Sequence, residues 1–193
     1  MNLDAARDYI LKRMASELSP HLHYHSIDHT FDVHHACLEL ARIEGVNGSD
    51  LALLETAAFF HDSGIIETYE NHEEASVKIA REILPEFGYT EDEMKIIECI
   101  ILKTKLPQSA ITLLGEILCD SDLDYLGRPD FFMIAQRLRY EWELMGNRYG
   151  LREWYEMQLR FLGNHKYYTR AARLLRDEGK RKNLTEIERT LGK

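Results

Sequence analysis

Hydrophobic side chains recur every three to four residues along almost the whole chain, which is the period of an amphipathic α-helix. The repeat predicts helices over residues 3–18, 29–40, 51–61, 72–83, 90–101, 114–126, 131–145, 154–161 and 168–175. A capping box from Thr185 to Glu188 predicts a short final helix. Because no segment shows the period of two that marks a strand, the sequence predicts an all-α fold.

The length of 193 residues suits one hydrophobic core, and nothing in the sequence resembles a join between two independent units. We therefore predict a single compact helical domain over residues 1–193. Hydrophobic residues at 45% and charged residues at 30% are typical of a globular protein. The net charge of -9 disfavours a general nucleic-acid surface, but it suits a protein that collects divalent cations.

Cysteine usage and hydropathy bear on where the protein works. Cys37, Cys99 and Cys119 are odd in number and lack CxxC spacing, so we expect buried thiols in a reducing cytoplasm. No apolar stretch reaches the roughly 20 residues that a membrane helix needs, and the first residues carry acids without a signal-peptide block. We expect a cytoplasmic protein that is neither exported nor embedded in a membrane.

The adjacent pair His61-Asp62 stands where the apolar helix over 51–61 ends. We expect Gly64 to end this helix and let the backbone turn away, so that both neighbouring side chains reach one metal ion. Imidazole nitrogen and carboxylate oxygen are good ligands for manganese, iron, nickel, cobalt and zinc. The pair is therefore the first candidate for a metal site.

His29 and Asp122 are two further candidate ligands, because each lies on the apolar face of its predicted helix. Asp120 and Asp124 lie on a different face from Asp122. Any one of these residues, taken alone, is more often a hydrogen-bonded core residue than a ligand. Together with His61-Asp62 they favour a metal, because buried aspartates beside inward histidines need a common partner and a cation is the simplest one.

Three more residues carry open alternatives. His72 begins the apolar stripe of its helix and is a candidate for supporting a ligand, binding a second metal or contacting substrate, or else it is a solvated helix start. His25 is either a phosphate contact or an exposed loop residue. Lys105 either counters the charge of a phosphate or serves the dipole at a helix C-terminus.

These residues resemble the signature of the HD superfamily of metal-dependent phosphohydrolases: a His, a His-Asp doublet and a distant Asp on an all-helical core. The matching residues are His29, His61, Asp62 and Asp122, within a core of about residues 24–128 that precedes a helical extension over 129–193. Members that hold two metals have another His near residues 103–105, where this chain has Lys-Thr-Lys. The resemblance therefore implies one divalent metal ion, or one bound tightly and a second bound weakly. It leaves manganese, iron, nickel, cobalt, zinc and magnesium open as the identity of the metal.

The resemblance implies a phosphohydrolase that acts on a small phosphorylated substrate, with a nucleotide as the expected class. Members with nucleotidase activity place a Glu three residues after the doublet, where this chain has Ile65. We expect Asp62 to accept a proton from the attacking water, and His72, His25 and Lys105, in falling order, to counter phosphate charge. The alternative is a non-catalytic metal- or nucleotide-binding sensor. We expect the extension to close the pocket or to make a homodimer.

Overall fold

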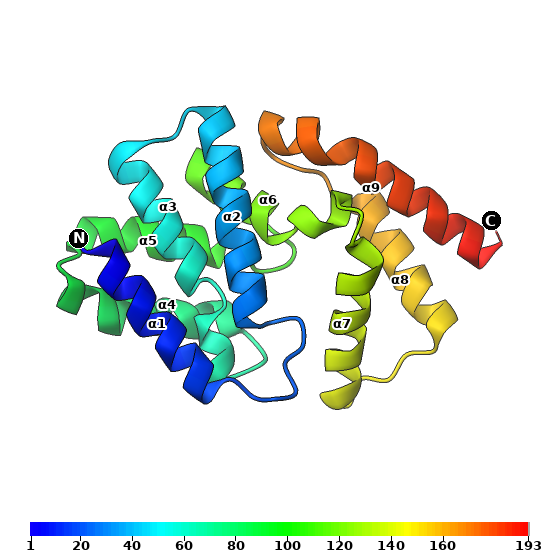
Figure 1. The fold of residues 1–193 in the computed structure, drawn as a ribbon, viewed down its shortest axis with the longest axis horizontal. Coiled ribbons are helices and arrows are strands. Elements are labelled where there is room, and N and C mark those ends of the chain that lie inside the picture. Colours follow the sequence, from blue (N-terminus) through cyan, green and yellow to red (C-terminus); the bar gives the residue numbers. More distant parts are fainter. Residues whose placement is uncertain (193) are drawn as a thin grey trace.

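In the computed structural model, which describes residues 1–192, all regular structure is helical (Figure 1). The α-helices are α1 (Leu3–Glu17), α2 (Ile27–Glu44), α3 (Gly48–Phe60), α4 (His72–Ile83), α5 (Glu91–Leu102), α6 (Leu113–Asp122), α7 (Phe131–Leu144), α8 (Leu151–Asn164) and α9 (Arg170–Leu191). The short 3-10 helices are η1 (Ser63–Ile66), η2 (Leu84–Phe87) and η3 (Asp124–Gly127). The predicted all-α fold is confirmed.

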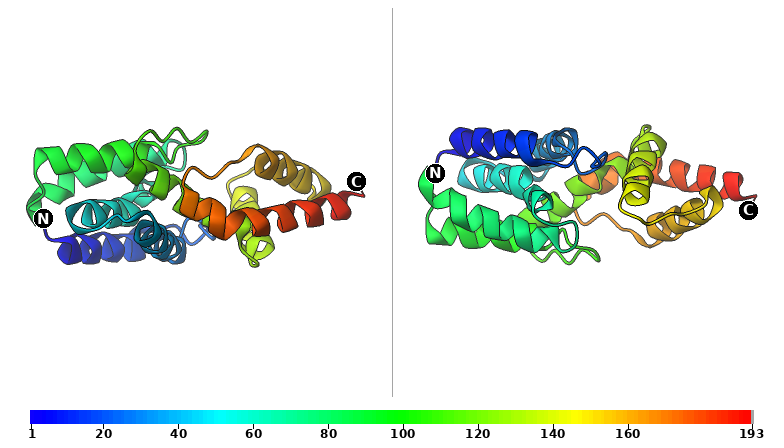
Figure 2. Two further views of the ribbon diagram at one scale, coloured as in Figure 1. Left: turned by 90° about the horizontal axis from the view of Figure 1, so that it is seen from above. Right: turned by 90° about the horizontal axis from the view of Figure 1, so that it is seen from below.

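The first six α-helices form the N-terminal half of an elongated molecule, with α3 at its centre (Figures 1 and 2). Helices α1 and α2 cover one side of α3, and α4 and α5 pack against one another on the other side. Seven consecutive or nearly consecutive residues of α3 are buried, from Leu53 to Phe60, as the apolar sequence predicted. The last residues of α3 therefore lie in the interior of the protein, and so does the His61-Asp62 pair that follows them.

Helices α7, α8 and α9 form the C-terminal half around a second hydrophobic cluster (Figure 1). Trp154 and Phe131 are fully buried at its centre. Each half also contributes to the hydrophobic cluster of the other half. Ala171 at the start of α9 packs in the cluster of the N-terminal half, and Tyr24 from the N-terminal half packs in the cluster of the C-terminal half. The prediction of one domain over residues 1–193 remains a prediction.

Helix α9 runs past η3 so closely that only glycine fits on either side. A Cβ added to Gly179 would lie 1.9 Å from the carbonyl oxygen of Gly127, and one added to Gly127 would lie 2.4 Å from the carbonyl oxygen of Arg176. The Asn183 amide donates hydrogen bonds to the carbonyl oxygens of Leu126 and Arg128 at 2.9 and 3.0 Å. These contacts fasten the C-terminal half directly behind the end of α6.

The short final helix predicted to open at Thr185 is wrong, because Thr185 lies inside the continuous helix α9. The capping-box pattern is present, but Asn183, Ile187 and Leu191 are buried on either side of it and the helix continues through. Tertiary contacts of this kind override a local end signal. Within residues 1–192, no helix combines the length and the apolar character required to cross a bilayer.

Candidate metal centre

His29 lies in the first turn of α2, which begins where the Ser26 side chain accepts a hydrogen bond from the His29 backbone N–H at 3.3 Å. This cap satisfies one of the free N–H groups at the helix start. The helix then turns the imidazole inward, so that its Nε2 atom lies 3.2 Å from Asp122 Oδ1 and 3.4 Å from Asp62 Oδ2. The apolar-face argument therefore gave the correct direction for this side chain.

His61 and Asp62 follow directly after α3, where the chain passes into η1. The His61 Nδ1 atom pairs with the carbonyl oxygen of Ala58 at 2.8 Å, and its Nε2 atom lies 3.2 Å from Asp62 Oδ2. Both residues are buried. The helix end thus brings the two neighbouring side chains together, as the sequence predicted.

The expected role of Gly64 is wrong. α3 has already ended at Phe60, and Gly64 lies within η1 without the positive φ of a helix-ending glycine. A Cβ at Gly64 would lie 2.1 Å from the carbonyl oxygen of His72 and 2.3 Å from the backbone nitrogen of Ser76. Gly64 is needed because η1 and α4 approach each other closely, which brings His72 up to the His61-Asp62 pair.

Asp122 is the last residue of α6 and completes a cluster with His29, His61 and Asp62. Ligand atoms of His29, His61 and Asp122 all lie within 4.8 Å of one another. His29 Nε2, His61 Nε2 and Asp62 Oδ2 are buried and make no hydrogen bond, although each lies 3.2–3.4 Å from another of these atoms or from Asp122. Unpartnered buried polar atoms are costly, and a shared cation would satisfy all of them. The residues therefore fit a divalent metal ion, and we call His29, His61, Asp62 and Asp122 the first cation site.

The electrostatics of the cluster point in the same direction. Burial lowers the pKa of His29, but the Asp122 and Asp62 carboxylates beside it outweigh burial and raise the pKa to about 10. Burial raises the pKa of Asp62, yet His61, His29 and His72 more than offset this and hold the pKa well below its usual range. The carboxylates therefore favour positive charge in the cluster. A divalent cation would supply that charge.

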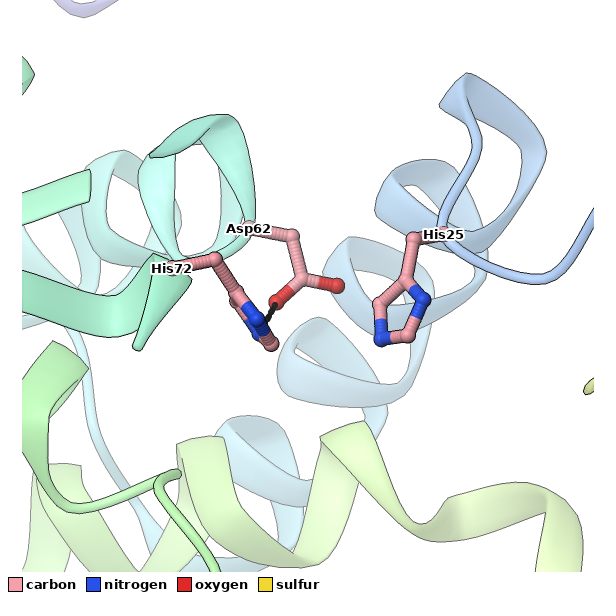
Figure 3. A group of neighbouring side chains, drawn as sticks. All are labelled: His25, Asp62 and His72. Atoms are coloured by element: carbon pink, nitrogen blue, oxygen red, sulfur yellow. Dashed lines mark ion pairs between the residues drawn. The ribbon is translucent and has the colours of Figure 1, made fainter. Parts of the chain in front are cut away.

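His72 and His25 lie beside this cluster, with the Asp62 carboxylate between them (Figure 3). His72 begins α4, and its Nε2 atom lies 3.3 Å from Asp62 Oδ1. Burial lowers the pKa of His72, but Asp62 outweighs it and raises the pKa to about 9. His25 precedes α2 and forms a third member of the group. The structure thus brings together six of the seven predicted site residues.

Lys105 is the predicted site residue that does not join the group. Its ammonium donates to Glu74 Oε1 at 2.5 Å and to Asn71 Oδ1 at 2.8 Å, in an exposed position after α5. The lysine does not line the cavity next to the cluster, although its neighbours Thr104 and Leu106 do. Its role in phosphate binding stays a prediction without a contact to support it.

Asp120 and Asp124 flank Asp122 and serve a different purpose from it. Asp120 accepts hydrogen bonds from the backbone N–H groups of Tyr168 and Thr169 at 2.8 and 2.7 Å. Asp124 pairs with Arg176 at 2.6 Å. Both carboxylates are buried, so the face of α6 and η3 that carries them is packed as well. Their contacts hold α9 and the residues just before it against this face.

Glu141 of α7 is an important residue that the sequence reading missed. It is fully buried, and it accepts hydrogen bonds from the backbone N–H groups of Tyr24 and His25, from the Tyr69 hydroxyl at 2.9 Å, and pairs with His25 Nδ1. A signal existed, because Glu141 is a carboxylate three residues after Leu138 on an apolar helix face. Its partners are more than 70 residues away in the chain, so the sequence could not name them.

A cavity of about 650 Å³ opens over Asp62, His72, His25 and Asp122. Its other walls are largely aromatic or aliphatic, and half of their residues come from α7 and α8. Those residues are Leu138, Trp142, Met157, Gln158, Arg160, Phe161 and Asn164. In the described part of the chain, Arg160 is the only lysine or arginine that lines this cavity. The extension therefore forms part of the cavity wall. Its expected role in closing the pocket or in making a homodimer stays a prediction.

Known proteins share this fold. A crystal structure described as a predicted HD superfamily hydrolase, from an uncultured Thermotogales bacterium, superposes with a TM-score of 0.64 at 21% identity over 98% of this chain and 91% of that one. A Lactobacillus plantarum protein superposes with a TM-score of 0.71 at 18% identity over 97% and 94%. At these identities the likeness establishes the fold.

Sequence comparison gives the family. An uncharacterized protein of Clostridium beijerinckii is 36% identical over 81 residues, which are 40% of this chain and 51% of that relative, so the chain spans about half of the relative's length. Residues 26–124, just over half of the chain, match the model of the HD domain. This segment holds all four residues of the first cation site. The chain therefore belongs to the HD-domain family.

Proposed function

We propose that this protein is a metal-dependent phosphohydrolase that cleaves a small phosphoester, with a nucleotide as the expected class. The observation that carries the proposal is the cluster of unpartnered, buried His29, His61 and Asp62 atoms next to a cavity that Asp62 and Asp122 line. A divalent cation held there lowers the pKa of a water molecule and neutralises phosphate charge.

The chain's own residues supply the remaining requirements. Asp62 lines the cavity and is the carboxylate placed to accept the proton of the attacking water. His72 and His25 also line the cavity, where their imidazoles counter the charge of the phosphate. Arg160 takes the charge-neutralising role proposed for Lys105, because it lies on the cavity wall and Lys105 does not.

The cavity also supports a class of leaving group. A volume of about 650 Å³ lies in the range of small-molecule sites, and Tyr69, Trp142 and Phe161 are among the lining residues. Aromatic walls suit a planar, partly apolar group such as a nucleobase. A cytoplasmic location, a small phosphorylated substrate without nucleic-acid or membrane partners, and a homodimer remain predictions from the sequence.

The test is phosphate release from a panel of nucleotides and other phosphomonoesters with manganese, cobalt or nickel added. We expect turnover by the wild type and none by Asp62→Asn. His34→Gln is the matched control, because His34 pairs with Glu55 at 2.8 Å outside the cluster. Thermal stabilisation by a nucleotide without any product would instead identify the binding-sensor alternative.

A further inference from the structure

A second cavity adjoins the one over the metal centre. It has a volume of about 560 Å³ and shares four lining residues with the first cavity. The shared residues are Leu106, Leu123, Phe161 and Asn164. Leu106 and Asn164 are exposed, so a ligand that fills the first cavity can continue along this border into the second. We call the second space the distal cavity.

The distal cavity differs from the first one in charge. In residues 1–192, no aspartate or glutamate lines it, whereas Asp62, Glu73 and Asp122 line the first cavity. Lys166 and Arg173 line the distal cavity, and both are exposed to water. The chain as a whole has a net charge of -9, so this excess of cations is local. Such a lining attracts an anion.

Arg173 is held at one end of its guanidinium and keeps donors free at the other. Its Nη1 atom donates to the carbonyl oxygens of Tyr167 and Tyr168 at 3.1 and 2.6 Å. Among the described residues, its Nε and Nη2 groups donate to no protein atom. Arg176, one turn further along α9, is instead paired with two carboxylates. Arg173 therefore has N–H groups left for phosphate or carboxylate oxygens.

His165 adds a neutral donor to the same cavity. The Lys180 ammonium donates to the carbonyl oxygen of His165 at 2.8 Å and lies 3.3 Å from its Nδ1 atom. Because an ammonium group only donates, Nδ1 accepts, and the proton of the neutral ring is assigned to Nε2. Burial and Lys180 lower the pKa of His165 to about 4, so the ring is neutral at pH 7. The Nε2–H group is buried without a partner, and an acceptor in the distal cavity would satisfy it.

The segment between α8 and α9 that carries these groups is fixed from below. The Asp120 carboxylate accepts hydrogen bonds from the backbone N–H groups of Tyr168 and Thr169 at 2.8 and 2.7 Å. The Tyr168 hydroxyl donates to the carbonyl oxygen of Gln108 on the opposite wall at 2.8 Å. The lining is therefore built before a ligand arrives, which reduces the entropy lost on binding.

We propose that the distal cavity binds a second anionic group of the substrate, remote from the phosphoester that is cleaved, through Lys166, Arg173 and His165. The substrate is then an elongated phosphoester with an anion at each end. Solvated surface charge alone would account for Lys166 and Arg173, but not for the unpartnered His165 Nε2 atom beside them. The inference deepens the proposed function and rests on it, because the first cation site is taken to hold the reacting phosphate.

Binding without turnover tests this proposal. Alkane bisphosphonates with a phosphonate at each end are compared with alkylphosphonates of the same length, because their C–P bonds are not hydrolysed. Calorimetric titration of the protein loaded with Mn²⁺ gives Kd for each compound. We expect the bisphosphonates of one range of lengths to bind roughly tenfold more tightly than the matching monophosphonates, since they add charge-assisted hydrogen bonds in the distal cavity.

Three variants locate this gain. Lys166→Gln and Arg173→Gln should each lose most of it and leave Kd for the monophosphonates unchanged. Arg170→Gln is the matched control and should keep the gain, because Arg170 is also an exposed arginine in the first turn of α9 but lines neither cavity. Lys166→Gln decides the matter if Arg173→Gln, which also loses the bonds to two carbonyl oxygens, does not fold as judged by circular dichroism.

The outcomes separate the distal site from the proposed function. Equal Kd values for bisphosphonates and monophosphonates at every length would overturn the distal site. A gain that both Lys166→Gln and Arg173→Gln retain, or that Arg170→Gln loses equally, would also overturn it. In each of these cases phosphate release from the ester panel would leave the proposed function standing. Monophosphonates that bind no better with Mn²⁺ than without it, together with no phosphate release, would overturn both.

Discussion

Replacing Gly179 with alanine tests how the extension is fastened to the rest of the molecule. Two effects of opposite sign compete at this position. Alanine in a helix interior is favoured over glycine by about 1 kcal/mol, which would stabilise α9. The new Cβ, however, would lie 1.9 Å from the carbonyl oxygen of Gly127, whereas real Cβ atoms stay at least 3.0 Å away from such atoms. The neighbour is backbone, so it cannot rotate aside and the two segments must separate.

Separation by about 1 Å would weaken the hydrogen bonds from Asn183 to Leu126 and Arg128 next to it. Overpacking costs about 1–3 kcal/mol and each lost hydrogen bond about 1 kcal/mol, so the steric effect outweighs the gain in helix propensity. We expect a net loss of about 2–4 kcal/mol in the free energy of unfolding. For a chain of this length this lowers Tm by roughly 5–15 °C.

Thermal and urea denaturation followed by circular dichroism measure this change. Gly163→Ala in α8 is the control, because a Cβ there meets nothing within 4 Å and should leave stability equal or up to about 1 kcal/mol higher. A Gly179→Ala protein as stable as the wild type would refute the view that backbone contact fastens α9 to η3.

Three further predictions concern separate parts of the molecule. Burial and Lys180 lower the pKa of His165 to about 4. In the unfolded chain His165 takes up a proton below about pH 6.5, so the free energy of unfolding should fall as the pH is lowered from 6.5 to 4. Lowering the pH from 7 to 5 should therefore reduce Tm by about 3 °C less in His165→Gln than in the wild type. Burial raises the pKa of the Cys37 thiol to about 12 and also raises that of Cys119, so a disulfide reagent at pH 8 should label Cys99 alone until the protein is unfolded. Trp142→Ala should raise KM for a nucleotide about tenfold with less change in kcat, because it removes part of the wall that contacts the leaving group.

The first cation site could be predicted because its residues carry local signals. His29 and Asp122 lie on the apolar faces of their helices. The helical period of the hydrophobic residues alone predicts that such side chains point toward the core. His61 and Asp62 follow an apolar helix that is buried on nearly all sides, so its end had to lie in the interior. Helical period and burial therefore sufficed to identify four candidate ligands, and to predict that the fold is all-α.

The remainder of the site depends on contacts between distant segments, which periodicity does not encode. The pattern placed Glu141 on an apolar helix face, but it could not reveal the pairing with His25, which is 116 residues away. Lys105 looked available for phosphate, whereas Glu74 and Asn71 occupy its ammonium group. Gly64 looked like a helix end, and its need for close packing on α4 becomes apparent only when both segments are in place.

Elemental analysis of the purified protein by mass spectrometry, beside its Asp122→Ala variant, tests the central claim most directly. Asp122 contributes an oxygen 3.2 Å from His29 Nε2 in the first cation site. The variant therefore lacks one of the four ligands of that site and should bind the metal less tightly. We predict at least one equivalent of a transition metal in the wild type and a loss of about one equivalent in the variant. Equal metal content in the two proteins, or no metal in either after incubation with manganese or nickel, would contradict the account.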